Sequence, residues 1–296
     1  IEGLHLRDAL QRTFELAPVA CSYEPNSNIN SNRLNEIDNL INSFIDDNQI
    51  PGAVVLVGDN KNILYQKSFG IKNPITDDKY QINDIFRIAS MTKAITSIGV
   101  IKLWEKGKIG LDDPIEKYIP EFKNVQILDS YNKKDTTYST IQTSKSISIR
   151  QLLTHTSGIG YDFIDGNPSI KSIYHKEKEK FMKYGVLCFC DQDITIGETI
   201  RNLAKVPLHH NPGERYTYGI GLDVLGYLIE IISGKTLDKY FYDEIFQPLD
   251  MNDTYFYLPE NKYDRLVPVL TKKNNKWVMF EDRSEERRVG KECPLL

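Results

Sequence analysis

The chain has 296 residues, of which 40% are hydrophobic, enough for one large core or for two domains that share one. Its 37 basic and 41 acidic residues are interspersed and leave a net charge of −4, so no basic surface for nucleic acid is expected. No apolar run approaches the roughly 18 residues of a transmembrane helix, so no transmembrane segment is expected.

The first 32 residues are interpreted as a separate N-terminal segment. They hold too many charges for the apolar core of a signal peptide, namely Glu2, Arg7, Asp8, Arg12 and Glu15. Cys21, which follows Pro-Val-Ala and precedes an Asn/Ser-rich spacer, resembles a bacterial lipoprotein cleavage site, although Pro18 stands where a leucine is expected. This similarity favours a periplasmic or secreted, lipid-anchored location over a cytoplasmic one.

The next residues indicate an amphipathic helix followed by a β-hairpin. Apolar residues recur at helical spacing from Leu34 to Asn48, and Gly52 ends this pattern. Two runs typical of strands follow, Ala53–Val57 and Ile63–Phe69, and the polar segment 58–62 joins them. The sequence therefore predicts a helix and then two antiparallel strands.

Ser90 and Lys93 lie three residues apart in an apolar segment that predicts a buried helix ending near Gly107. Residues at this spacing share one face of a helix, so the hydroxyl and the amine can touch. A serine becomes a good nucleophile when a base takes its proton, and burial and the helix N-terminus both favour a neutral lysine that can do so. The alternative is that Ser90 only caps the helix and that Lys93 extends to the surface.

The chain contains a second pair with the same spacing, Ser130 and Lys133. It lies in a polar stretch, residues 129–135, that has no apolar periodicity, and we interpret it as a solvated loop. The spacing alone is therefore a weak signal, and the apolar surroundings are what distinguish Ser90.

The middle of the chain, residues 107–207, is polar and is predicted to be a helical insert with little strand character. Leu111–Ile115 is typical of a turn, and helices are expected at Ile149–Leu153 and Ile196–Leu203. The four cysteines, of which two fall in this insert, do not form a disulfide framework: they are Cys21, Cys188, Cys190 and Cys293. The closely spaced pair in the insert has no second pair to complete a metal site, so free thiols are the better interpretation.

Beyond the insert, Tyr218 begins a run that leads into an amphipathic helix, Leu222–Ile232, with Gly234 as its C-cap. In a fold whose chain returns after an insert, this tyrosine would lie near the serine–lysine pair, where it can relay protons to a leaving group. The alternative is ordinary packing with its neighbours Tyr216 and Tyr227.

Five segments occur in a characteristic order: Phe86–Lys93, Leu111–Pro114, Leu152–Gly158, Pro212–Arg215 and Tyr218–Gly226. Together they resemble the serine β-lactamase and penicillin-binding-protein-like superfamily, in its class C β-lactamase and carboxylesterase branch, over about residues 33–282. The resemblance implies an α+β fold of the β-lactamase/transpeptidase type, an antiparallel sheet flanked by helices with an all-helical insert. It implies one α/β domain from residues 33–106 and 208–282, with residues 107–207 as the insert.

The resemblance also implies a role for each of three residues. Ser90 matches the acyl-accepting nucleophile, Lys93 its base or proton relay, and Tyr218 a general acid or base. The backbone N–H of the serine would be one oxyanion donor. His155 matches a structural position, and no G-x-S-x-G elbow supports a Ser-His-Asp triad. Neither a cofactor nor a metal is implied.

Two departures from the family pattern bear on completeness and substrate. The β-lactamases read Tyr-x-Asn where this chain has Ile220. An isoleucine cannot make the hydrogen bond that the asparagine gives to the antibiotic, so β-lactam hydrolysis is less expected than ester hydrolysis.

The third family landmark follows the other two and lies on a late strand, whereas its only match in letters, Lys183–Gly185, lies between them. Residues 283–296 resemble a translated sequencing adapter, and we interpret them as an artefact. We therefore expect the C-terminal sheet strands to be missing, and this chain alone to fold poorly and have little activity.

The sequence thus predicts a serine hydrolase that forms an acyl-enzyme on small-molecule esters or amides, a β-lactamase-related carboxylesterase. A class C-type β-lactamase and a D-amino-acid peptidase remain open, with a β-lactam or a D-amino-acid peptide as the substrate. A different class also remains open, a non-catalytic protein that binds peptidoglycan or a β-lactam. The acyl group, the leaving group and the oligomeric state are not predicted.

Overall fold

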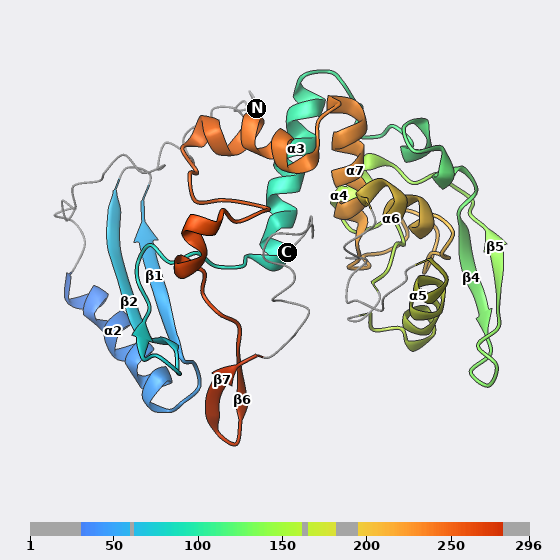
Figure 1. The fold of residues 1–296 in the computed structure, drawn as a ribbon. Coiled ribbons are helices and arrows are strands. Elements are labelled where there is room, and N and C mark those ends of the chain that lie inside the picture. Colours follow the sequence, from blue (N-terminus) through green and yellow to red (C-terminus); the bar gives the residue numbers. More distant parts are fainter. Residues whose placement is uncertain (1–30, 60–61, 162–164, 182–194, 281–296) are drawn as a thin grey trace. The chain divides into compact units, whose positions relative to one another are not determined.

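The computed structural model describes residues 31–59, 62–161, 165–181 and 195–280 (Figure 1). Most of the predicted N-terminal segment, all four cysteines and the adapter-like tail lie outside the described residues. The described helices and strands are, in chain order, α2 (Ser31–Asp46), β1 (Gly52–Gly58), β2 (Ile63–Asn73), β3 (Asp78–Lys79), α3 (Thr92–Glu105), β4 (Gln126–Tyr131), β5 (Tyr138–Gln142), α4 (Ile149–Leu153), α5 (Pro168–Phe181), α6 (Ile196–Leu203), α7 (Gly221–Ser233), α8 (Leu237–Phe241), β6 (Leu270–Lys273) and β7 (Lys276–Met279).

The described residues form two compact units. One unit holds residues 31–87 and 246–280, and the other holds residues 88–245. The boundaries that the resemblance implies, at 106/107 and at 207/208, delimit the insert of the family fold rather than these units, and they stay a prediction.

In the first unit, α2 lies against a small antiparallel sheet with the strand order β1-β2-β3 (Figure 1). β1 and β2 pair along the whole of β1, which confirms the predicted hairpin. Asp38 of α2 accepts hydrogen bonds from Tyr65 and Lys67, two side chains on β2. The predicted helix and hairpin are therefore joined by polar contacts as well as by apolar packing.

The late part of the chain adds the hairpin β6–β7 to the same unit. Ile85 N–H donates to the carbonyl of Arg265 at 2.8 Å, and Val267 N–H donates to the carbonyl of Ile85 at 2.9 Å. Asn48, just after α2, donates from Nδ2 to the carbonyl of Asn275 at 2.7 Å. Segments separated by about 180 residues or more thus share one unit through hydrogen bonds to backbone carbonyls.

The second unit is built around α7, which contacts α3, α4, α6 and α8. Its side chains Val224, Leu225, Leu228 and Ile229 are fully buried. α7 ends as predicted, at Gly234, whose left-handed backbone (φ 68°) lets its N–H donate to the carbonyl of Glu230 at 2.9 Å. The segment of Tyr218 therefore leads straight into the most buried helix of this unit.

The predicted burial of the Ser90 segment on every side is wrong. α3 buries Thr96, Val100 and Leu103, and it contacts α7 and α8, whereas Met91 is 66% exposed and Trp104 45% exposed. Because apolar residues lie all around this segment, its sequence did not indicate which side is packed.

The insert is not all-helical. α4 and α6 form at the predicted positions, but β4 and β5 pair as an antiparallel hairpin that includes part of the predicted loop, residues 129–135. Leu128 N–H donates to the carbonyl of Leu208 at 3.0 Å, and Leu208 N–H donates to the carbonyl of Gln126 at 2.7 Å. These long-range bonds support a strand that a polar composition does not indicate.

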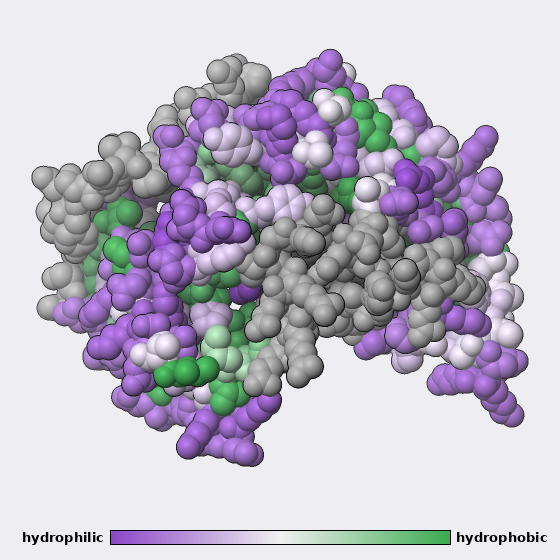
Figure 2. All heavy atoms as spheres, viewed as in Figure 1, coloured by the Kyte–Doolittle hydropathy of each residue, from purple (hydrophilic) through white to green (hydrophobic). Residues whose placement is uncertain are grey.

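The described surface in the view of Figure 2 is mainly hydrophilic, and hydrophobic residues form small groups on it. Some large aromatic side chains lie inside, among them Tyr174, Phe122 and Phe241, which are at most 2% exposed. Among the described helices, none combines the length and the hydropathy that a membrane crossing requires.

Candidate active site

Ser90 lies in a 3₁₀ turn, Ala89–Met91, that leads directly into α3. The residue is exposed, and its side chain does not cap the helix, whose N-cap is Met91. Lys93 in the first turn of α3 is half-buried, and its Nζ donates a hydrogen bond to Ser90 Oγ at 3.4 Å. The alternative of a capping serine and a surface lysine therefore does not describe this site.

Tyr218 reaches the same oxygen from a distant part of the chain. Its hydroxyl donates to Ser90 Oγ at 2.9 Å, across 128 residues of sequence. Lys93 Nζ also lies 5.3 Å from the centre of the Tyr218 ring, within the range of a cation–π contact. The structure thus brings together the three residues that the sequence singled out, with the serine oxygen as their common point.

The ring of His155 packs against the ring of Tyr218. Its ring centre lies 4.8 Å from that of Tyr218, and its Nδ1 accepts a hydrogen bond from Gly219 N–H at 3.4 Å. Its own carbonyl accepts from Thr217 N–H at 2.7 Å. Burial, and then the nearby charge of Lys93, lowers the pKa of His155, so the ring is neutral at pH 7. A neutral ring held in this way is consistent with the structural position that the resemblance implies.

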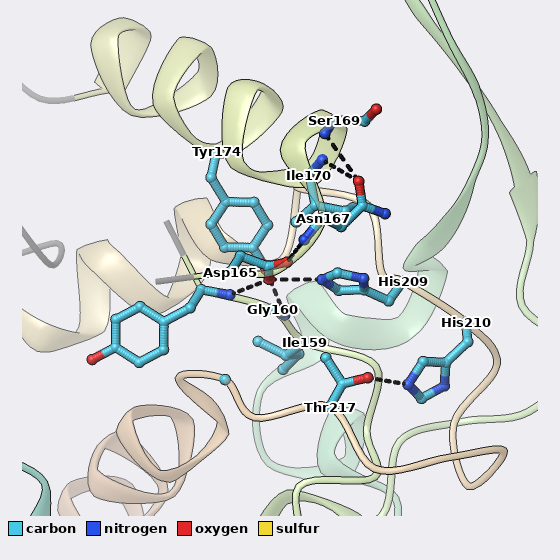
Figure 3. Close-up of polar contacts among 12 residues, drawn as sticks. Ile159, Gly160, Asp165, Asn167, Ser169, Ile170, Tyr174, His209, His210 and Thr217 are labelled. Carbon is cyan, nitrogen blue, oxygen red and sulfur yellow. Dashed lines mark hydrogen bonds and ion pairs between the residues drawn. The ribbon is translucent and has the colours of Figure 1, made fainter. Parts of the chain in front are cut away.

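His210 fixes the residue that precedes Tyr218 (Figure 3). Its Nδ1 lies 2.8 Å from the carbonyl oxygen of Asn211, which can only accept, so this nitrogen carries the proton. Its Nε2 then accepts from the hydroxyl of Thr217 at 2.8 Å. Burial is the largest influence on the pKa of His210 and lowers it, which favours this neutral tautomer.

Tyr161 is a site residue that the sequence reasoning missed. Its ring stacks on that of Tyr218, with 5.9 Å between the centres and 5° between the planes. Lys93 Nζ lies 5.8 Å from the centre of the Tyr161 ring, so the ammonium contacts both tyrosines. The available signal was its position three residues after the Leu152–Gly158 segment that carries part of the family resemblance.

The arrangement provides an accessible hydroxyl with two side chains able to exchange protons with it. A neutral amine or a phenolate at hydrogen-bond distance can accept a proton from serine, and the resulting ammonium or phenol can return one to a leaving group. Across residues 31–59, 62–161, 165–181 and 195–280, no group of three or more His, Cys, Asp or Glu residues is placed to hold a metal ion.

Comparison with protein families identifies the family of the chain. The family model described as Beta-lactamase matches residues 37–287. The chain belongs to the Beta-lactamase family. This result confirms the serine β-lactamase and penicillin-binding-protein-like resemblance.

Two relatives are named as esterases. The chain is 29% identical over 221 residues to esterase EstB of Burkholderia gladioli, a match that covers 74% of this chain and 50% of the relative. It is 29% identical over 228 residues to lovastatin esterase of Penicillium rubens, which covers 75% of this chain and 52% of the relative. The chain therefore spans about half the length of the curated relatives it matches.

A solved structure shows the fold. The unliganded simvastatin synthase LovD of Aspergillus terreus superposes with a TM-score of 0.69 at 24% identity, and the match covers 88% of this chain and 63% of LovD. The predicted α+β fold of the β-lactamase/transpeptidase type is thereby confirmed.

Proposed function

We propose that the protein is a serine hydrolase that forms an acyl-enzyme on ester substrates. The observation that carries the proposal is the exposed Ser90 Oγ, which accepts hydrogen bonds from both Lys93 Nζ and Tyr218 Oη. Membership of the Beta-lactamase family and the esterase names of two relatives support it.

The reaction proceeds in two steps with Ser90 as the nucleophile. Its oxygen bonds to the substrate carbonyl carbon, and its proton passes to Lys93 or to Tyr218, whichever is deprotonated. The bond from this carbon to the leaving oxygen then breaks, and the same relay protonates the alcohol that departs. In the second step, water gives a proton to the relay and its oxygen bonds to the carbonyl carbon of the acyl-enzyme. The bond from this carbon to Ser90 Oγ then breaks, and the relay returns a proton to Ser90.

An ester is the favoured substrate because the position next to the site offers no side-chain hydrogen bond. Ile220 is only 3% exposed and is apolar, so it cannot bind the amide of a β-lactam side chain. We therefore expect turnover of short p-nitrophenyl esters to exceed turnover of a chromogenic cephalosporin. Equal efficiency toward both substrates would contradict this ranking.

Replacement of the nucleophile tests the mechanism. In the full-length parent protein, which is used for every activity assay, Ser90→Ala should lower kcat for p-nitrophenyl butyrate by at least about 10³-fold, because the covalent route is lost. The matched control is Ser130→Ala, since Ser130 has the same spacing to a lysine but lies exposed on the β4–β5 hairpin. Loss in Ser90→Ala with normal activity in Ser130→Ala supports the proposal, whereas near-normal activity in Ser90→Ala refutes it.

The non-catalytic alternative makes a different prediction. A protein that only binds β-lactams or peptidoglycan would be labelled at Ser90 by a penicillin probe without releasing it, or would not be labelled at all. We expect instead that a fluorophosphonate probe labels Ser90 and that esters turn over. Mass spectrometry of the labelled peptide, together with a steady-state ester assay, separates these outcomes.

A further inference from the structure

Beside the site lies a buried carboxylate–imidazole pair that the proposed mechanism does not use. Asp165 Oδ2 and His209 Nε2 are 2.8 Å apart, and their side chains are 3% and 8% exposed (Figure 3). Because a carboxylate only accepts hydrogen bonds, the histidine nitrogen carries the proton. A carboxylate this deeply buried is rare unless it is paired or hydrogen-bonded, as Asp165 is here.

Asp165 accepts three hydrogen bonds, two from its own segment and one from a distant residue. Besides the ring of His209, the backbone N–H of Tyr161 donates to it at 3.0 Å and that of Asn167 at 2.8 Å. Burial opposes its ionisation, but these hydrogen bonds outweigh burial and lower the pKa of Asp165, so it is a carboxylate at pH 7. The carboxylate of Asp165 thus holds the backbone of Tyr161 through a hydrogen bond from its N–H.

Gly160 shows how closely this pair fits the backbone. A Cβ atom there would lie 2.6 Å from both Asp165 Oδ2 and His209 Nε2, so only glycine leaves room for them. The N–H of Gly160 donates to the hydroxyl of Tyr174 on α5 at 3.0 Å, and its carbonyl accepts from Ile220 N–H at 3.2 Å. The backbone on either side of the Tyr161 peptide is therefore held at several points.

Tyr161 connects this anchored backbone to the reacting groups. Tyr161 is 8% exposed, and its ring stacks on the ring of Tyr218 and lies 5.8 Å from Lys93 Nζ. A shift of the Tyr161 backbone would move this ring, and with it the two groups that share the Ser90 proton. A misplacement of about 1 Å in a reacting group can lower the rate by about 10²-fold.

We propose that Asp165 and His209 are positioning residues that hold Tyr161 against Tyr218 and Lys93. The proposal rests on the proposed hydrolase function. The pair itself touches neither Ser90 nor the proton relay through any hydrogen bond found among the described residues. Its effect is transmitted through the peptide and the ring of Tyr161.

The first test compares two replacements of His209. His209→Phe keeps a ring but removes the donor to Asp165, and it should lower kcat by about 10- to 100-fold with little change in KM. His209→Gln keeps an N–H donor and should recover most of the lost kcat. Thr195→Ala is the control for general destabilisation, because it removes the N-cap of α6, whose side-chain hydrogen bonds go to Glu198 and not to this pair, and it should leave kcat unchanged.

A double-mutant cycle asks whether the effect passes through Tyr161. Tyr161→Leu should lower kcat by itself, and His209→Phe should then add little, because the ring that it would displace is gone. Multiplicative losses in the double variant would overturn the proposal. A kcat for His209→Phe near the wild-type value would overturn it as well.

Amide hydrogen exchange tests the positioning without using activity. In His209→Phe the exchange of the Tyr161 amide should accelerate, while the amides of α7 stay protected in both proteins. Unchanged exchange at Tyr161 would refute the positioning role even if esters are hydrolysed. Normal activity of Ser90→Ala would refute the hydrolase function instead, so the two failures can be told apart.

Discussion

Tyr218 is the residue whose hydroxyl contributes most directly to the proposed proton relay, since it lies 2.9 Å from Ser90 Oγ. Tyr218→Phe removes this hydroxyl but keeps the ring that contacts Tyr161 and His155. We expect kcat for p-nitrophenyl acetate to fall by about 10²- to 10⁴-fold, the usual contribution of a general acid or base. Tyr216→Phe is the matched control, because this neighbouring tyrosine is 65% exposed, and unchanged kinetics in Tyr218→Phe would contradict the relay.

Ala89, directly before the proposed nucleophile, has an unusual backbone. Its φ of +43° lies in the left-handed region, which costs a residue with a Cβ atom about 1–2 kcal/mol. Ala89→Gly removes this strain but adds about 0.5–1 kcal/mol of conformational entropy to the cost of folding. We therefore expect the free energy of unfolding to stay equal or to rise slightly, as measured by urea denaturation.

The control for this substitution lies on the same segment. Ala94 is exposed and has a helical backbone in α3, so Ala94→Gly should lower the free energy of unfolding by about 1 kcal/mol. If both glycine substitutions destabilise the protein equally, the backbone of Ala89 is not strained in solution.

At the scale of elements, the C-terminus of α7 depends on Gly234. Its φ is 68°, and a Cβ atom would meet nothing within 4 Å, so the cost of alanine there arises from the backbone alone. Gly234→Ala should lower the free energy of unfolding by about 1 kcal/mol. Gly166→Ala is the control, since that position also has open space but no positive φ, and it should be neutral or slightly stabilising. Equal effects at both positions would show that the left-handed cap does not contribute.

Two elements that we did not predict from the sequence, α5 and the β4–β5 hairpin, differ in the strength of their sequence signals. α5 has a signal, because Asn167 accepts hydrogen bonds from the N–H groups of Ser169 and Ile170 as its N-cap, and Pro168 follows at the first helical position. Ile170, Ile173 and Tyr174 are buried on this helix at the i, i+3, i+4 spacing expected of one face. The hairpin β4–β5 has no comparable signal, since most of its side chains are polar and its partner Leu208 is far away in the sequence.

At the level of the whole molecule, two histidines, the half-buried His155 and the buried His210, make stability depend on pH. Burial, the largest cause at each, lowers the pKa of both His155 and His210 in the folded protein below their value in the unfolded chain, about 6.5. Below that pH the unfolded chain takes up protons that the folded protein does not. The free energy of unfolding should therefore fall as the pH decreases from about 7.5 to about 5.5, measured by urea denaturation at each pH.

Glu230 acts in the opposite direction and supplies a control. Burial raises the pKa of Glu230, so the folded protein binds a proton there more readily and gains stability as the pH falls. Glu230→Gln removes this contribution and still accepts the hydrogen bond that Leu237 N–H donates at 2.9 Å. The decrease with falling pH should be at least as steep in this variant, and a flat profile in both proteins would contradict the role of the two histidines.

Sequence patterns were enough to predict several local elements and the candidate reacting groups. Helix periodicity predicted α2 and α7, strand-like runs predicted β1 and β2, and the ordered family segments indicated Ser90, Lys93 and Tyr218. Each of these signals depends on residues close together in the chain or on a family pattern, which is why it can be detected without coordinates.

Tertiary structure alone decided what surrounds those groups. The stacking of Tyr161 on Tyr218, the buried pair of Asp165 and His209, and the exposed side of α3 all depend on contacts between distant segments. Such contacts have no fixed spacing in the sequence, because the intervening chain can take any length that its loops allow. The candidate reacting groups could therefore be predicted from residue types and motifs. The packing that orients them could be seen only in the folded chain.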